Sequence, residues 1–113
     1  MIVLRSETNL QPDSGTTSMG LIEQQTMTEA LVRARSDLAR RLGVPENDIS
    51  EGAVEQTEFP DAALGAPAKG EMSAQVISDG WRIRLMANGK PYEYRANARQ
   101  LRLFNFDGEN YRV

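Results

Sequence analysis

The side chains able to do chemistry in this 113-residue chain are carboxylates and guanidinium groups, because the sequence contains neither cysteine nor histidine. The missing imidazole excludes Ser-His-Asp and Cys-His mechanisms. The same two absences exclude the usual zinc sites. A reaction would have to use acids and arginines alone, such as Asp61, Glu71 and Arg84, and no phosphate loop or serine nucleophile elbow is present. We therefore expect a protein that is not an enzyme and that has no metal and no cofactor.

Arginines gather in the second half of the chain. Residues 65–113 carry eight basic and five acidic residues, whereas residues 1–64 carry five basic and eleven acidic ones. Arg82, Arg84 and Arg95 are expected to share one sheet face, because neighbouring hairpin strands align alternate residues. Such a face could bind a phosphate, a carboxylate-bearing partner or single-stranded nucleic acid. The alternative is a solvated face on which Glu93 pairs with a neighbouring arginine. The net charge of −3 and the lack of interleaved exposed aromatic residues disfavour nucleic acid.

The stretch Phe59-Pro-Asp-Ala-Ala-Leu-Gly-Ala-Pro-Ala-Lys-Gly70 predicts a shaped loop between two strands. Its two prolines fix φ and its two glycines permit positive φ, whereas a flexible linker would be rich in glycine and serine. We expect a recognition surface here, contacted through Asp61, Leu64 and Lys69, with Leu64 projecting as an anchor. The alternative is that Phe59 and Leu64 cap an open end of the core while Asp61 bonds the backbone amides of its own turn.

A helix is predicted over residues 26–42. Thr26-Met-Thr-Glu29 has the form of a capping box, and apolar residues then recur at helical spacing as far as Leu42. Gly43 fits the left-handed position that ends a helix, and Pro45 prevents the helix from resuming.

The residues after the helix predict an antiparallel meander. Extended segments are expected at Val54–Phe59, Ser73–Ser78, Trp81–Ala87, Pro91–Ala96, Leu101–Phe106 and Glu109–Val113.

Turn signals separate these segments, and alternation sets their faces. Asp79-Gly80 predicts a turn, and Asn88-Gly89 is the preferred dipeptide of a type I′ hairpin. The apolar face of Trp81, Ile83 and Leu85 is expected to meet Leu31, Leu38 and Leu42 of the helix.

The predicted fold class is α+β, with one long helix packed on an antiparallel β-meander of four to five strands. Residues 1–25 predict a mostly irregular N-terminal arm, with weak support for a strand at Ile2–Arg5, and residues 26–113 predict a single domain. No apolar run is long enough to cross a bilayer, and the patch at Met1–Arg5 is too short for a signal-peptide core. The chain therefore predicts no membrane partner and leaves its compartment unknown, with the absence of cysteine compatible with the cytoplasm.

Three blocks of the sequence, in order, resemble a family of small, often exported bacterial proteins of unknown function. The blocks are DLARRLGVPENDI (37–49), FPDAALGAP (59–67) and QVISDGWRIRLMANGKPYEYRAN (75–97). Members typically show a Trp or Phe, Pro-Asp, Leu-Gly-Cys-Pro and a Gln-Val-Ile run. A Pro-Gly-Tyr-Arg-Ile strand and a Tyr-x-Tyr-His ending follow. The resemblance implies no known activity.

The chain departs from that family pattern at three positions. Ala66 stands where relatives often carry cysteine, so the disulfide that the pattern implies is missing and an oxidising compartment is less supported. Arg95 replaces the histidine of the Tyr-x-Tyr-His ending, so no role of that imidazole carries over. Asp79 replaces the turn proline, which changes little because Asp-Gly also forms turns.

The sequence thus leads to a non-catalytic interaction module that presents residues 59–72 to an unknown protein or peptide partner. The expected binding residues are Asp61, Leu64, Lys69, Arg82 and Arg84. A second hypothesis is a reactive-loop protease inhibitor resembling the potato-inhibitor scaffold, since a rigid loop loses little entropy on docking. Ala63, Leu64 or Lys69 would then be the specificity residue. The chain is expected to be a monomer or a homodimer paired through edge strands.

Overall fold

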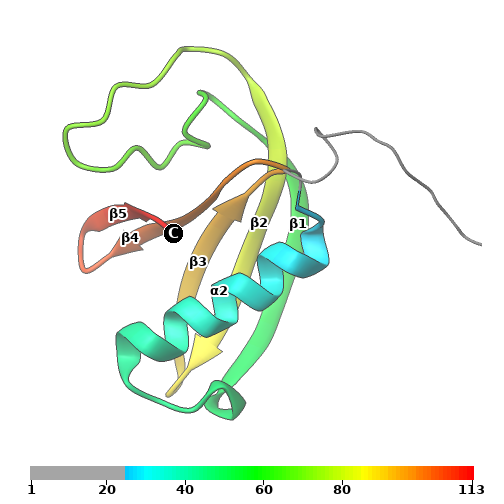
Figure 1. Cartoon of the computed structure of the whole chain (residues 1–113), viewed down its shortest axis with the longest axis vertical. Coiled ribbons are helices and arrows are strands. Elements are labelled where there is room, and N and C mark those ends of the chain that lie inside the picture. Colours follow the sequence, from blue (N-terminus) through cyan, green and yellow to red (C-terminus); the bar gives the residue numbers. More distant parts are fainter. Residues whose placement is uncertain (1–24) are drawn as a thin grey trace, which may run out of the picture.

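The computed structural model describes residues 25–113, so the expected arm before Gln25 and its strand at Ile2–Arg5 lie outside the described residues. The elements in chain order are α2 (Met27–Leu42), the 3-10 helix η1 (Glu46–Asp48), β1 (Ile49–Phe59), β2 (Ser78–Ala87), β3 (Lys90–Ala96), β4 (Leu101–Phe106) and β5 (Glu109–Arg112). The five strands form one antiparallel sheet in the order β1-β2-β3-β4-β5. The helix lies across one face of this sheet (Figure 1), so the predicted α+β meander is confirmed with five strands.

Helix α2 begins and ends as the sequence predicts. The Thr26 hydroxyl accepts from the Glu29 amide at 3.0 Å, and the Glu29 carboxylate accepts from the Thr26 amide at 2.8 Å. Gly43 adopts φ 70° at the C-terminal end, where only glycine avoids a steric penalty. At 16 residues, α2 is of ordinary length rather than long. Within residues 25–113, no helix combines the length and apolar character needed to span a membrane.

Two hairpin turns contain dipeptides that favour type I′ geometry. Asn88 and Gly89 have φ 54° and 76°, and Asp107 and Gly108 have φ 52° and 87°. Positive φ at both central residues is the mark of the type I′ turn, whose twist matches that of the flanking strands. The Asn88-Gly89 prediction is therefore confirmed.

The sheet corrects two predictions near the start of β2. Residues 73–77 form no strand, because β2 begins at Ser78, and Asp79-Gly80 lies inside β2 rather than in a turn. Gly80 is needed there for close approach, since a β-carbon at this position would lie 2.3 Å from the Ala96 carbonyl oxygen and 3.2 Å from the Phe59 ring. Strand β1 is also longer than predicted, because pairing with β2 starts at Ile49.

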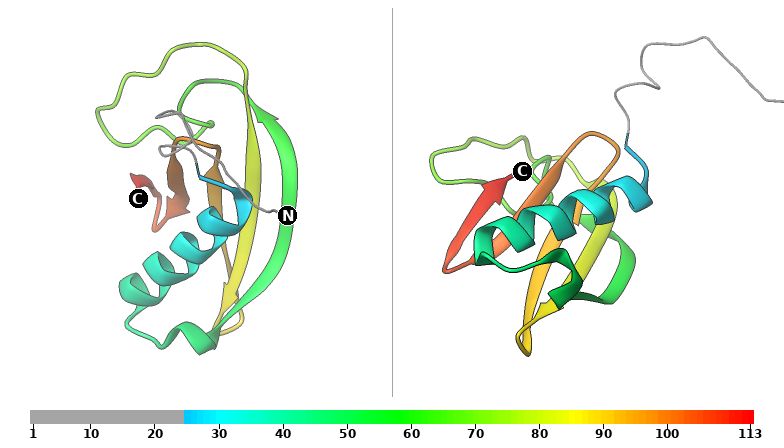
Figure 2. Two further views of the ribbon diagram at one scale, coloured as in Figure 1. Left: turned by 45° about the vertical axis from the view of Figure 1, so that its right-hand side comes forward. Right: turned by 60° about the horizontal axis from the view of Figure 1, so that its bottom comes forward.

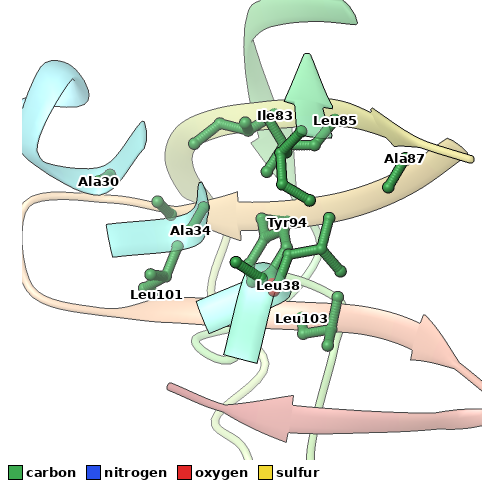
Figure 3. Close-up of a cluster of buried hydrophobic side chains, with 12 residues drawn as sticks. Ala30, Ala34, Leu38, Ile83, Leu85, Ala87, Tyr94, Leu101 and Leu103 are labelled. Atoms are coloured by element: carbon green, nitrogen blue, oxygen red, sulfur yellow. The ribbon is translucent and has the colours of Figure 1, made fainter. Parts of the chain in front are cut away.

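The main core lies between α2 and the sheet. Figure 3 shows Leu38 of α2 over Tyr94, with Ile83 and Leu85 of β2 and Leu103 of β4 around it. Burying each such side chain contributes about 1.5–3 kcal/mol. The predicted contact between the helix and the Trp81/Ile83/Leu85 face is thus present, although Leu31, Leu42 and Trp81 are only partly buried.

A polar contact crosses this core. The Tyr94 hydroxyl donates to Oδ2 of Asp37 at 2.7 Å, and the buried Asp37 carboxylate also pairs with Arg40 and with Nε of Arg41, the latter at 2.7 Å. Burial, and then the hydrogen bond to Asp37, raise the pKa of Tyr94 well above its ordinary value. The hydroxyl therefore stays protonated and acts as a donor.

Candidate recognition loop

The connection between β1 and β2, residues 60–77, has two parts with different surroundings. The inner half, residues 60–71, contacts β3, β4 and β5 through side chains. The outer segment, residues 72–77, forms neither helix nor strand and belongs to the arch that stands away from the sheet before it joins β2 (Figure 1). The inner half and the outer segment therefore differ in which side chains a partner could contact.

Asp61 shapes the inner half. Its Oδ1 accepts from the amides of Ala63 and Gly65, both at 2.9 Å. Leu64 and Gly65, inside this turn, have φ 59° and 66°. Asp61 therefore has the structural role that the sequence offered as the alternative to partner contact.

Arginine side chains of the sheet form hydrogen bonds with the inner half of the connection. Arg95 Nη1 donates to the carbonyls of Leu64 and Gly65, each at 3.1 Å. Arg102 forms two hydrogen bonds with the carboxylate of Glu71, at 2.5 and 2.8 Å. The bond to Arg102, then the bond from the Ala68 amide, lowers the pKa of Glu71 to about 2. The loop is thus fixed by charge-assisted hydrogen bonds.

Amide side chains complete the attachment of the inner half. Gln100 Nε2 donates to the Ala62 carbonyl at 2.7 Å, and Asn110 Nδ2 donates to the Pro67 carbonyl at 3.0 Å. These bonds come from the residue directly before β4 and from β5, so the loop spans several strands.

The expectation that Leu64 projects as an anchor is wrong. Leu64 is 0% exposed, and Phe59, Ala63 and Ala66 are buried as well. None of the four belongs to the core under α2. The guanidinium of Arg95 lies over the ring of Phe59, 5.2 Å from its centroid. The turn made by Asp61 directs Leu64 inward, so Phe59 and Leu64 have the capping role that was the alternative.

The burial of Ala63 and Leu64 also argues against two of the three specificity residues expected under the protease-inhibitor hypothesis. Ala63 and Leu64 are buried and cannot enter a protease specificity pocket. Lys69 is exposed, but Gly70 beside it has φ 79° in a turn. Of the three expected specificity residues, only Lys69 is accessible.

The predicted arginine face exists, and its charges are paired. Arg82 lies opposite Arg95 in the sheet, and Arg84 lies opposite Glu93. The Glu93 carboxylate accepts from Nε of Arg82 at 3.1 Å and from Nε of Arg95 at 2.8 Å, and lies 3.9 Å from Arg84. Arg82 is thus engaged within the protein, whereas the side chain of Arg84 remains 55% exposed.

The outer segment presents apolar side chains that the sequence did not single out as a site. Met72 is 94% exposed, Ile77 73% and Val76 53%. The segment is held where the Ala62 amide donates to the Ala74 carbonyl at 2.9 Å. The Gln-Val-Ile run suggested a strand because of its apolar residues, but no strand pairs with it among residues 25–113. Its apolar residues therefore face solvent.

The enzyme hypothesis would require a pocket that gathers Asp61, Glu71 and Arg84. A cleft of about 730 Å³ opens beside the end of the β3–β4 pairing and includes Arg84, Tyr92 and Phe104, but it includes neither Asp61 nor Glu71. Among the described residues, no three acidic side chains are placed to hold a metal ion.

Comparison with known proteins gives one match. A family described as a domain of unknown function (DUF8738) matches residues 31–104, from the second turn of α2 through most of β4 and including the whole β1–β2 connection. No curated protein and no solved structure matches the chain. The family description carries no activity, organism or compartment, so the exported bacterial relatives expected from the sequence stay a prediction.

Proposed function

The chain belongs to the family described as a domain of unknown function (DUF8738), and on that premise we propose that it is a non-catalytic interaction module. The β1–β2 connection supplies the contact surface for a protein or peptide partner. Recognition uses the outer segment, with the inner half as its support.

The observation that carries this proposal is the exposure of Met72, Val76 and Ile77 within six residues. Single exposed apolar residues are ordinary, but a group of them on one segment is typical of an interaction site. Met72 is the most exposed large apolar residue among those described. Its flexible thioether side chain adapts to varied partner surfaces.

The attachment of the outer segment at both of its ends also favours a role in recognition. Glu71 is bonded to Arg102 directly before Met72, and Ser78 after Ile77 is paired with Phe59 in the sheet. A segment held at both ends loses less conformational entropy when it binds. Lys69 and Arg84 are the expected polar residues that remain accessible for the partner.

An affinity-capture experiment tests the proposal with a matched pair of variants. The double substitution M72S/I77S should abolish capture of partners from cell extract, because it removes the two most exposed apolar side chains. Val32→Ser is the control, since Val32 is also an exposed apolar residue, 60% exposed, but lies on α2. Capture by M72S/I77S equal to that by the unmodified protein would contradict the proposal.

A further inference from the structure

Strand β1 lies at one edge of the sheet formed by the described residues. It is the first strand in the sheet order, and no strand pairs with its outer side among residues 25–113. Figure 2 shows β1, in green, along one margin of the sheet. An edge strand leaves backbone N–H and C=O groups available to an added strand. At 11 residues, β1 is much longer than the opposite edge strand β5, which has four.

A β-bulge limits the part of β1 that can take a further strand. The register with β2 shifts between Glu51 and Val54. Gly52 sits tightly against β2 there, since a β-carbon on it would lie 3.2 Å from the Arg84 carbonyl oxygen. Beyond the shift, pairing is regular from Val54 to Phe59. Because bulges interrupt pairing, the stretch Val54–Phe59 is the available edge.

This edge carries one sign of charge. Residues 46–58 contain five acidic residues and no basic residue. Glu51 pairs with Arg35 at 2.8 Å, and Glu55 lies 3.7 Å from Arg82. Glu58 lies directly opposite Asp79, another exposed acid. Two like charges in opposite positions of a sheet destabilise it, so a cation placed beside them would be stabilising.

We propose that the β1 edge binds an extended basic segment of a partner protein, which adds to the sheet as a strand beside Val54–Phe59. The backbone of β1 supplies hydrogen bonds, as in other cases of strand addition. Glu55 and Glu58 lie on opposite faces because strand side chains alternate. Basic residues on both faces of the added segment therefore match this edge.

A second copy of the chain is the rival occupant. Antiparallel pairing of two β1 strands would bring together three acids from each copy, Glu51, Glu55 and Glu58, without a basic residue in either strand. The repulsion between them disfavours the edge-paired homodimer, at least through β1.

Titration of the full chain with a short peptide of repeated Lys-Lys-Thr-Thr, which as a strand places lysines on both faces, followed by nuclear magnetic resonance, tests the inference. Backbone amide shifts and slowed hydrogen exchange are expected at Val54–Phe59, and binding should weaken as salt rises and screens the charges. The same peptide with glutamate for lysine should not bind. Absence of saturable binding, or amide shifts confined to other strands, would overturn the inference.

Reversing the charges of Glu55 and Glu58 tests whether these two residues contribute to peptide binding. E55K/E58K should weaken binding of the lysine peptide by about tenfold or more. Glu109→Lys on β5, also an exposed acid on an edge strand, should change it little, with circular dichroism confirming that each variant is folded. Equal affinity of E55K/E58K and the unmodified protein would refute the inference, as would sedimentation of β1-paired dimers. The loop variant M72S/I77S should bind the peptide normally, so failure here is distinguishable from failure of the proposed function.

Discussion

The guanidinium of Arg102 and the carboxylate of Glu71 form two parallel hydrogen bonds, with N···O distances of 2.5 and 2.8 Å. Arg102 lies on β4 and is 5% exposed, while Glu71 ends the inner half of the β1–β2 connection. The pair therefore sets where the loop leaves the sheet and where the exposed outer segment begins.

Removing one partner of this pair should cost substantial stability. Glu71→Ala leaves the buried Arg102 without its carboxylate, so we expect the free energy of unfolding to fall by about 2–3 kcal/mol, below the figure for fully buried pairs because Glu71 is partly exposed. Urea denaturation measures this change. Glu109→Ala removes an exposed acid and should change stability by less than about 0.5 kcal/mol. Equal losses in the two variants would contradict the role assigned to the pair.

The depressed pKa of Glu71 predicts a dependence of stability on acid. The carboxyl titrates at about 2 in the folded protein, against an ordinary value of 4.5, so the folded state binds fewer protons there than the unfolded state. The stabilisation is complete above pH 4.5 and is lost as the pH falls toward 2. Melting temperatures of Glu71→Gln should therefore fall less steeply over that interval than those of the unmodified protein. Parallel melting curves would show that Glu71 does not supply this dependence.

The hydrogen bond between Tyr94 and Asp37 should make a measurable contribution to the free energy of unfolding. Tyr94→Phe removes the donor 2.7 Å from a buried carboxylate oxygen, which should lower the free energy of unfolding by about 1–3 kcal/mol. Tyr92 is half-buried on the same strand, and Tyr92→Phe serves as the control, with an expected change below about 0.5 kcal/mol. Thermal unfolding of both variants decides between a supporting hydrogen bond and a neutral one.

Truncation of Leu64 should lower the free energy of unfolding, whereas truncation of Met72 should leave it almost unchanged. Leu64→Ala opens a cavity at a fully buried site and should cost about 2–5 kcal/mol. Met72→Ala, at a residue that is 94% exposed, should leave stability within about 0.5 kcal/mol. Denaturation of the two variants checks this order. A stable Leu64→Ala protein would restore Leu64 as a candidate contact residue.

Gly80 should be intolerant of any side chain. In Gly80→Ala the new β-carbon would lie 2.3 Å from the Ala96 carbonyl oxygen, so β2 and β3 must shift, at a cost of about 1–3 kcal/mol. Gly52→Ala meets Arg84 at 3.2 Å and should be the milder change. Comparison of their melting temperatures tests the argument, and the reverse order would contradict it.

Features set by neighbours in sequence were predictable. The capping box at Thr26 and Glu29, the left-handed Gly43 and the Asn88-Gly89 turn each depend on residues a few positions apart, so their local chemistry decides the conformation. The pairing of β2 with β3 and of β4 with β5 follows from the same kind of signal, because two-residue turns join antiparallel neighbours.

The loop depended on contacts that the sequence does not display. Leu64 is buried because Arg95 and Arg102 hold the surrounding backbone from positions 31 and 36 residues further on. The dipeptide Asp79-Gly80 predicts a turn, but a glycine also permits a strand to approach its neighbour closely. Only the pairing of β2 with β1, in which Asp79 and Gly80 lie opposite Glu58 and Thr57, distinguishes these cases. For the same reason, the exposure of Met72, Val76 and Ile77 could not be foreseen from a run that resembles a strand.

The outer segment spans two fixed points, at Glu71 and Ser78, and buries none of its large side chains. The exposed side chains of Met72, Val76 and Ile77 are therefore expected to add little to the stability of the core. Peptide epitopes grafted in place of residues 75–77 should therefore leave the fold intact, and the domain, which has no cysteine, would display them without thiols that must be kept reduced.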